Sequence, residues 1–186
     1  QDVAKDQDDQ FAGTLERMLI GPRSKNTAGK IRLWAEAASM IMNHVVDMEE
    51  VDKENIAVAG HSRLGKAALL AGALDQRFKY TIVNESGCGG ASLNLHRQGE
   101  SIAEMTRNFP WWYAENFKRC QDNHVAERFD QHFILALTAP RYLYVASAAQ
   151  DTGADIEGEY MACVLADEAY KKLGKKGFVG EGLSPD

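Results

Sequence analysis

Cysteine is scarce in this chain of 186 residues, which contains only Cys88, Cys120 and Cys163. An odd number of cysteines without close pairs argues against a disulfide framework and against a cysteine-based metal site. The apolar stretches are too short to cross a bilayer, so no membrane partner is expected. Acidic residues outnumber basic ones, and the net charge of −6 lacks the positive excess typical of nucleic-acid-binding proteins.

The remaining composition is ordinary for a soluble globular protein. Hydrophobic residues make up 45% and charged residues 26% of the chain, and the length allows a sizeable core. No internal repeat or low-complexity tract is present. The chain begins at Gln1 without a signal peptide and ends at Asp186 without a terminating element. We therefore expect residues 1–186 to form a single partial domain, truncated at both ends.

The stretch Gly60-His61-Ser62-Arg63-Leu64-Gly65-Lys66 carries the strongest chemical signal. An apolar run at residues 55–60 indicates a strand before it, and residues 66–74 indicate a helix after it. A strand, a tight turn with one serine and a helix are the context of a nucleophile elbow. Such a turn lifts the hydroxyl above the sheet, and Gly60 and Gly65 leave room where strand and helix approach closely.

Two other interpretations of this stretch stay open, namely a turn that grips phosphate and the solvated start of a helix. A Walker A loop does not fit, because Ala67 stands where that motif needs Ser or Thr. The spacing Gly60-x-Ser62-x-x-Gly65 also departs from the common G-x-S-x-G, which weakens a generic serine-hydrolase interpretation.

Strand and helix patterns alternate along the chain, which predicts a parallel sheet. Strands are expected at residues 55–60, 79–84 and 142–147, and helices at 11–20, 31–48, 66–74 and before Gly174. Residues 1–10 are expected to be a loop, 91–128 an irregular insertion over the sheet rim, and 175–186 an unfinished, glycine-rich remainder. The expected buried stripes are Trp34, Ala37, Ala38, Ile41, Val45 and Met48 in the 31–48 helix, and Ala162, Leu165, Ala166, Ala169 and Leu173 in the last one. Cys163 is expected in the core.

Two acids follow the serine at predicted strand ends. An activated serine needs a base within hydrogen-bond reach and an acid that orients this base. Glu85 ends the second strand and Asp151 the third, and the carboxyl ends of parallel strands gather at one edge. Either acid suits the role, and either equally suits a helix cap or a solvated loop. Aromatic residues at 109–113 are expected mainly to anchor the insertion, with Trp111 as the candidate for stacking on a sugar ring.

Several motifs, in order, resemble the glucuronoyl esterases of carbohydrate esterase family 15. The elbow has the pattern Gly-x-Ser-Arg-x-Gly-Lys-x-Ala, and residues 84–91 are similar to the family's Glu-Ser-Gly-x-Gly-Gly segment. Phe109-Pro110-Trp111-Trp112 and Asp130-Gln131-His132 are also similar, and residues 144–151 resemble bacterial members. The likeness covers residues 30–177. It implies an α/β-hydrolase fold, a three-layer sandwich around a mostly parallel sheet.

The resemblance also implies catalytic roles. Ser62 would be the nucleophile. Arg63 would offer its backbone N–H and its guanidinium to the oxyanion of the tetrahedral intermediate. Glu85 and Asp151 match the two acid positions of the family. Neither a metal nor an organic cofactor is implied, and the location implied is secreted or periplasmic.

Three residues are the candidates for substrate binding. Lys66 and Glu100 match family positions that hydrogen-bond the hydroxyls of a glucuronic acid ring, and Trp111 is the aromatic candidate. Bacterial relatives usually carry a Trp two residues after the second acid, where this chain has Gly153. We therefore expect one sugar contact to be lost or supplied elsewhere.

None of the histidines matches the catalytic position of the family, which lies on a loop after a further strand. All five precede Asp151, and they are His44, His61, His96, His124 and His132. His61 is next to Ser62, but consecutive residues at an elbow point away from each other. We expect His44 on the surface, a structural role for His132, and the catalytic histidine beyond residue 186.

The sequence thus predicts part of a serine esterase that acts through an acyl-enzyme on Ser62. Its substrate would be the ester between (4-O-methyl)glucuronic acid of glucuronoxylan and lignin alcohols. A general carboxylesterase or an acetyl-xylan esterase of the same fold is the alternative among enzymes. A catalytically inactive fragment or a carbohydrate-binding remnant is the alternative of another class, and the oligomeric state stays open.

Overall fold

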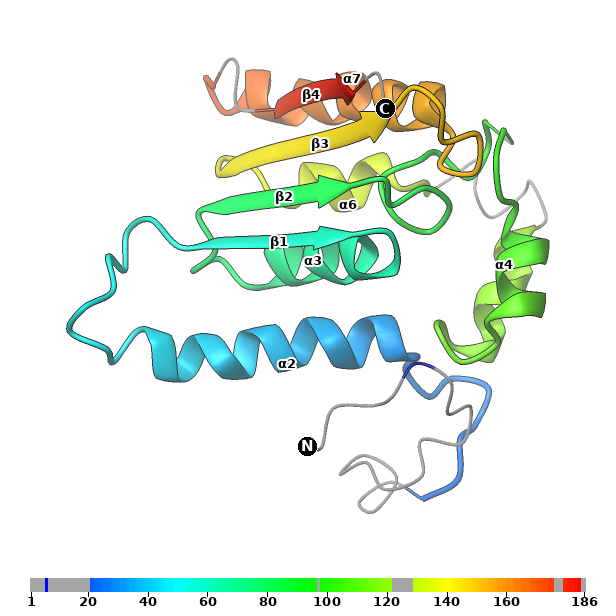
Figure 1. The fold of residues 1–186 in the computed structure, drawn as a ribbon, viewed down its shortest axis with the longest axis horizontal. Coiled ribbons are helices and arrows are strands. Elements are labelled where there is room, and N and C mark those ends of the chain that lie inside the picture. Colours follow the sequence, from blue (N-terminus) through cyan, green and yellow to red (C-terminus); the bar gives the residue numbers. More distant parts are fainter. Residues whose placement is uncertain (1–5, 7–20, 97, 122–128, 176–178, 185–186) are drawn as a thin grey trace.

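The computed structural model describes residues 6, 21–96, 98–121, 129–175 and 179–184. Its centre is a four-stranded parallel sheet in the order β1-β2-β3-β4 (Figure 1). The strands are Ala57–His61, Tyr80–Asn84, Tyr142–Ala148 and Val179–Ser184. The parallel sheet predicted from the alternating patterns is confirmed, and all strands end at the same edge.

Strand β4 was missed by the sequence analysis. The prediction of an unfinished remainder at residues 175–186 was wrong, because β4 pairs with β3 from Leu143↔Val179 to Ala148↔Ser184. Glycine at alternate positions of this segment disfavours a strand when only local preference is considered. The ladder with β3 overrides that preference.

Helices cover one face of the sheet. Right-handed crossovers between neighbouring parallel strands put α3 (Arg63–Leu74), α6 (His132–Ala136) and α7 (Ile156–Lys172) on that face (Figure 1). The core between these layers is formed by Leu69 of α3, Leu135 of α6 and Ala166 of α7 against Val83 and Val145. On the other face, Ile82 and Tyr144 remain partly exposed. The described residues thus supply the sheet and one helical layer.

Three further elements surround this unit. Helix α2 (Lys30–Val45) packs against α3, whereas α4 (Ile102–Asn108) and the 3₁₀ helix η1 (Glu115–Gln121) lie beyond the carboxyl ends of the strands (Figure 1). The prediction of an irregular segment at 91–128 was therefore partly wrong. Its sequence did hold a helix signal, because Ser101 and Glu104 form a capping box at the start of α4. No helix in the described ranges is long and apolar enough to cross a membrane.

The predicted buried stripes of two helices were partly wrong. Ala162 and Ala166 are buried as predicted, and Ala38 and Val45 pack against a core cluster, but other members of the stripes are exposed. Helix α2 buries Ile31, Ala35 and Met42, whereas the predicted Ile41 and Met48 are exposed. Helix α7 likewise buries Ala162, Cys163, Ala166 and Tyr170 and exposes Leu165 and Leu173. Apolar residues occupy much of the circumference of both helices, so their sequence allows several phases, and packing against the neighbouring elements selects one. Burial of Cys163 and exposure of His44 agree with the predictions.

The expected loop at residues 1–10, apart from Asp6, and the expected helix at 11–20 lie outside the described residues.

Candidate active site

Ser62 occupies the turn between β1 and α3 in a strained backbone conformation. Its φ is 54° and its ψ is −126°, in a region that residues with a side chain rarely adopt. The turn is held because the Ser62 N–H donates to Asn84 O at 2.8 Å, and Ser62 O accepts from the Lys66 N–H at 3.2 Å. The strand–turn–helix conformation of an elbow, predicted from the sequence, is therefore present.

A cavity of about 330 Å³ opens beside Ser62. Six of the predicted site residues line it together, although they come from the separate segments that follow β1, β2 and β3: Ser62, Arg63, Lys66, Glu85, Glu100 and Asp151. The rest of its wall is formed by Ser86, Gly87, Cys88, Phe109, Trp112, Gly153 and Ala154.

Trp111, the predicted aromatic contact, does not line this cavity, whereas its neighbour Trp112 does. Trp112 stacks on Phe109 with ring centroids 3.8 Å apart, and the Lys66 Nζ lies 5.8 Å from its ring centroid. Trp111 meets Phe109 edge-on, at 6.2 Å between centroids. The two tryptophans are adjacent in a segment predicted to be irregular. The sequence therefore does not indicate which of them lines the cavity and which anchors the segment.

Asp6 is a site neighbour that the sequence analysis missed. Its Oδ2 lies 3.1 Å from Arg63 Nε. Its Oδ1 accepts from the indole N–H of Trp112 at 2.7 Å and from that of Trp111 at 3.3 Å. Asp6 thus ties the guanidinium beside the serine to the aromatic wall. A lone acid in a polar stretch carries no signal of such a contact.

The two candidate acids both reach the cavity, but they differ in their contacts. Glu85 has a φ of 47° at the end of β2, and its Oε2 lies 3.2 Å from His61 Nδ1. Asp151 Oδ1 accepts from the Gly153 N–H at 2.9 Å, within its own loop. His61 is not part of the cavity wall, and its side chain is 66% exposed.

Lys66 is a buried cation at the floor of the cavity. Its Nζ donates to Cys88 O at 2.6 Å and to Ser86 O. Burial lowers the pKa of Lys66, whereas burial raises the pKa of Glu100 against the opposing effect of the Lys66 charge. Burial also raises the pKa of the Cys88 thiol to about 12. The thiol is therefore protonated at neutral pH and does not compete with Ser62 as a nucleophile.

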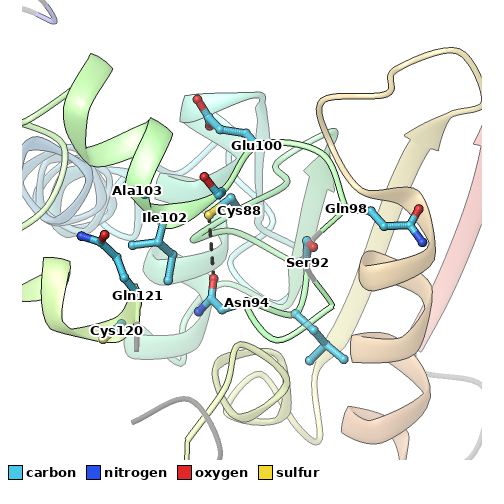
Figure 2. A pocket seen from close by; sticks show the side chains of 11 residues that line it. Cys88, Ser92, Asn94, Gln98, Glu100, Ile102, Ala103, Cys120 and Gln121 are labelled. Carbon is cyan, nitrogen blue, oxygen red and sulfur yellow. Dashed lines mark hydrogen bonds between the residues drawn. The ribbon is translucent and has the colours of Figure 1, made fainter. Parts of the chain in front are cut away.

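A second cavity of about 200 Å³ adjoins the first and shares Cys88 and Glu100 with it (Figure 2). Several of its polar side chains bond to other residues of the protein. Ser92 donates to Asp155 at 2.9 Å, and Gln98 donates to Glu157 at 3.3 Å. Because these side chains already have hydrogen-bond partners within the protein, few of their polar atoms are available to a ligand. We therefore place the candidate site in the first cavity.

Among the described residues, no histidine lines the cavity beside Ser62. His96 bonds to Asp155 with 2.7 Å between Nδ1 and Oδ1, and His132 begins α6. His124 lies outside the described residues. The described residues also hold no cluster of three or more His, Cys, Asp or Glu that could bind a metal ion.

Comparison with known proteins identifies the family. A family model described as glucuronyl esterase of fungi matches residues 3–174. The chain belongs to the glucuronoyl esterase family. The resemblance noted from the elbow and the segments after it is thereby confirmed.

Relatives within the glucuronoyl esterase family include prokaryotic and fungal proteins. A carbohydrate esterase from an unknown prokaryotic organism is 42% identical over 153 residues, which is 82% of this chain and 35% of the relative. A 4-O-methyl-glucuronoyl methylesterase of Phanerochaete chrysosporium is 35% identical over 128 residues, 63% of this chain and 27% of the relative. The chain thus spans 27% to 35% of the length of these two curated relatives.

Solved structures of glucuronoyl esterases share the fold. The glucuronoyl esterase from Solibacter usitatus matches with a TM-score of 0.88 and 32% identity, covering 98% of this chain and 52% of that one. A promiscuous family 15 esterase from a marine bacterial metagenome matches with a TM-score of 0.78 and 35% identity, covering 86% and 45%. The chain has the α/β-hydrolase fold, as the sequence analysis predicted.

Proposed function

We propose that this chain is the central part of a serine esterase that hydrolyses glucuronoyl esters. The substrate would join the (4-O-methyl)glucuronic acid of glucuronoxylan to lignin alcohols. The observation that carries the proposal is the strained turn at Ser62, which opens into a cavity shared with Arg63, Lys66, Glu85 and Asp151. Relatives named 4-O-methyl-glucuronoyl methylesterase support the substrate class.

The reaction would proceed through an acyl-enzyme. Ser62 Oγ attacks the ester carbonyl carbon and passes its proton to a base, while the carbonyl π electrons move to oxygen. The Arg63 backbone N–H and guanidinium stabilise the resulting oxyanion. When the intermediate collapses, the bond to the alcohol oxygen breaks and the alcohol takes the proton from the base. Water then repeats the sequence on the acyl-enzyme and releases glucuronic acid and free Ser62.

The base would be a histidine that the present chain does not include. Glu85 or Asp151, both in the cavity wall, would orient it. This fits a chain that spans 27% to 52% of the length of the relatives described above. We accordingly propose that residues 1–186 belong to one larger catalytic domain, which would be secreted or periplasmic.

Lys66 and Glu100 would recognise the hydroxyls of the sugar. Lys66 has three N–H donors and directs two of them to Ser86 O and Cys88 O. The third remains for a ligand oxygen. Glu100 supplies an acceptor in the same cavity. Trp112, instead of the predicted Trp111, contributes to the wall of this cavity.

One observation favours a broader carboxylesterase as the second candidate. Gly153 stands in the cavity wall where bacterial relatives usually carry Trp, so the wall there has no side chain. One of the solved relatives is described as promiscuous. A wider cavity would accept acetate esters as well as glucuronate esters. Inactivity of the chain by itself, as a fragment or a carbohydrate-binding remnant, is the other alternative.

Hydrolysis of benzyl glucuronate and of an acetate ester by the complete enzyme tests these candidates. We expect the wild type to cleave the glucuronate ester much faster than the acetate ester and Ser62→Ala to cleave neither. Equal rates on both esters would favour the carboxylesterase. Indistinguishable activity of the wild type and Ser62→Ala would remove Ser62 from the mechanism.

A further inference from the structure

Glu159, in the first turn of α7, is a fully buried carboxylate that the proposed mechanism does not use. Its Oε1 accepts from the N–H of Ser86 at 3.0 Å, from the N–H of Gly87 at 2.8 Å and from Ser86 Oγ at 3.1 Å. Its Oε2 accepts from Ser147 Oγ. Four donors thus converge on one side chain.

Such a group is costly for a protein core. A buried carboxylate loses its hydration, and only hydrogen bonds or paired charges offset that loss. Burial raises the pKa of Glu159, and the bonds from Ser147, Gly87 and Ser86 oppose this effect. An apolar residue would fill the same space at lower cost. The position of the four donors therefore indicates what the carboxylate does.

The donors belong to the exits of the two strands that end in the candidate acids. Ser86 and Gly87 directly follow Glu85, whose φ of 47° is unfavourable for a residue with a side chain. Ser147 lies in β3, shortly before Asp151. Glu159 therefore links the end of β3 to the segment that directly follows Glu85.

The segment after Glu85 is also held from its other side. Lys66 Nζ donates to Ser86 O and Cys88 O, whereas Glu159 accepts from the N–H groups of Ser86 and Gly87. A cation on the carbonyls and a carboxylate on the amides fix the peptide planes that set the direction of the Glu85 side chain.

We infer that Glu159 is a positioning residue, which holds Glu85 in the direction that the catalytic base requires. The inference rests on the proposed function and names no new contact with substrate. Of the two candidate acids it assigns the orientation of the base to Glu85, and it predicts that loss of Glu159 affects the chemical step through Glu85.

A double-mutant cycle between Glu159 and Glu85 tests this, with benzyl glucuronate and the complete enzyme. We expect Glu159→Ala to lower kcat roughly ten- to hundredfold with little change in KM, because a small misplacement of a catalytic group is costly. In the Glu85→Ala background, Glu159→Ala should add no further loss. Glu159→Gln should stay within about threefold of wild type, since its amide oxygen still accepts the three Oε1 bonds.

Asp155→Ala is the matched control. Asp155 is also a buried acid, at the N-cap of α7, but it bonds to Ser92, His96 and the Gly158 N–H and not to the amides directly after Glu85. It should lower the melting temperature and leave kcat within about threefold, because Asp155 bonds neither the Ser86 nor the Gly87 N–H. Amide hydrogen exchange gives a readout independent of activity, in which Glu159→Ala should accelerate exchange at Ser86 and Gly87.

The outcomes separate the two claims. Suppose that the wild type is active. If the loss of kcat in Glu159→Ala is fully additive to the loss in Glu85→Ala, or if Asp155→Ala loses as much, that result would overturn the positioning role. Unchanged exchange at Ser86 and Gly87 would do the same. A wild type no more active than Ser62→Ala, with faster exchange in Glu159→Ala, would refute the proposed function while leaving Glu159 as the group that holds this loop.

Discussion

Replacing Gly60 with alanine tests the close approach that the elbow depends on. An added Cβ at this position of β1 would lie 2.1 Å from the carbonyl oxygen of Leu64 and 2.8 Å from the backbone nitrogen of Gly65. Both atoms belong to the backbone in the first turn of α3, so no side chain can turn aside. Strand and helix would have to separate by more than an ångström to restore ordinary contact at 3.4 Å.

The expected cost is about 3 kcal/mol or more, the upper range for overpacking, because rigid backbone must move. For a chain of this size this corresponds to a fall in melting temperature of about 6 to 12 °C. The separation would also relax the φ of Ser62, so kcat should fall together with stability. Thermal and urea unfolding, followed by tryptophan fluorescence, measure the first effect.

Two other glycines provide internal controls. At Gly174 the φ is 72° and nothing lies within 4 Å of an added Cβ, so Gly174→Ala should cost only about 1 kcal/mol from backbone strain. At Gly65 an added Cβ would meet its neighbours at 3.1 Å, and the gain in helix propensity would partly offset that contact. A Gly60→Ala variant as stable as Gly174→Ala would refute the argument for a close approach.

Three further predictions concern the core and the cavity floor. Tyr170→Phe removes the 2.6 Å bond between two buried hydroxyls, those of Tyr170 and Thr138, and should cost about 1 to 2 kcal/mol in urea unfolding; an unchanged midpoint would contradict it. Arg141→Met should cost about 1.5 to 3 kcal/mol, because the guanidinium donates to Gly72 O in the last turn of α3 and, at 2.9 Å, to Phe78 O in the connection to β2. Equal stability would show these bonds to be dispensable. Burial lowers the pKa of Lys66 in the folded protein below its value of 10.5 in the unfolded chain. At a pH between these two values the unfolded chain binds more protons than the folded protein. The free energy of unfolding should therefore rise with pH in that window. Lys66→Met should abolish this slope in urea titrations at several pH values, and an identical slope in both proteins would contradict the assignment.

Some residues of the candidate site could be predicted from the sequence, and others could not. The elbow and the two acids were found because strands, turns and strand ends are encoded over short stretches of sequence, by backbone preference and by alternation. Their meeting in one cavity follows from the parallel order, since the carboxyl ends of neighbouring strands share an edge. The family motifs added Lys66 and Glu100, which local patterns alone would assign to the surface.

Other parts depended on packing. Three features involve residues that are far apart in the chain. They are the position of Trp112, and not Trp111, in the cavity wall, the contact of Asp6 with Arg63, and the hydrogen bonds to the buried Glu159. The buried sides of α2 and α7 were also decided by their neighbours, because apolar residues are spread around both helices.

The sequence by itself determined the alternation of strands and helices and the sharp turn that carries Ser62. These features arise from sterics and hydrogen bonds within a few residues, so they can be recognised without the fold. Only the tertiary structure decided which side chains face the serine, and how the loops after β2 and β3 are held. Those contacts exist only once the sheet has brought distant segments together, and their energies depend on burial that no short stretch contains.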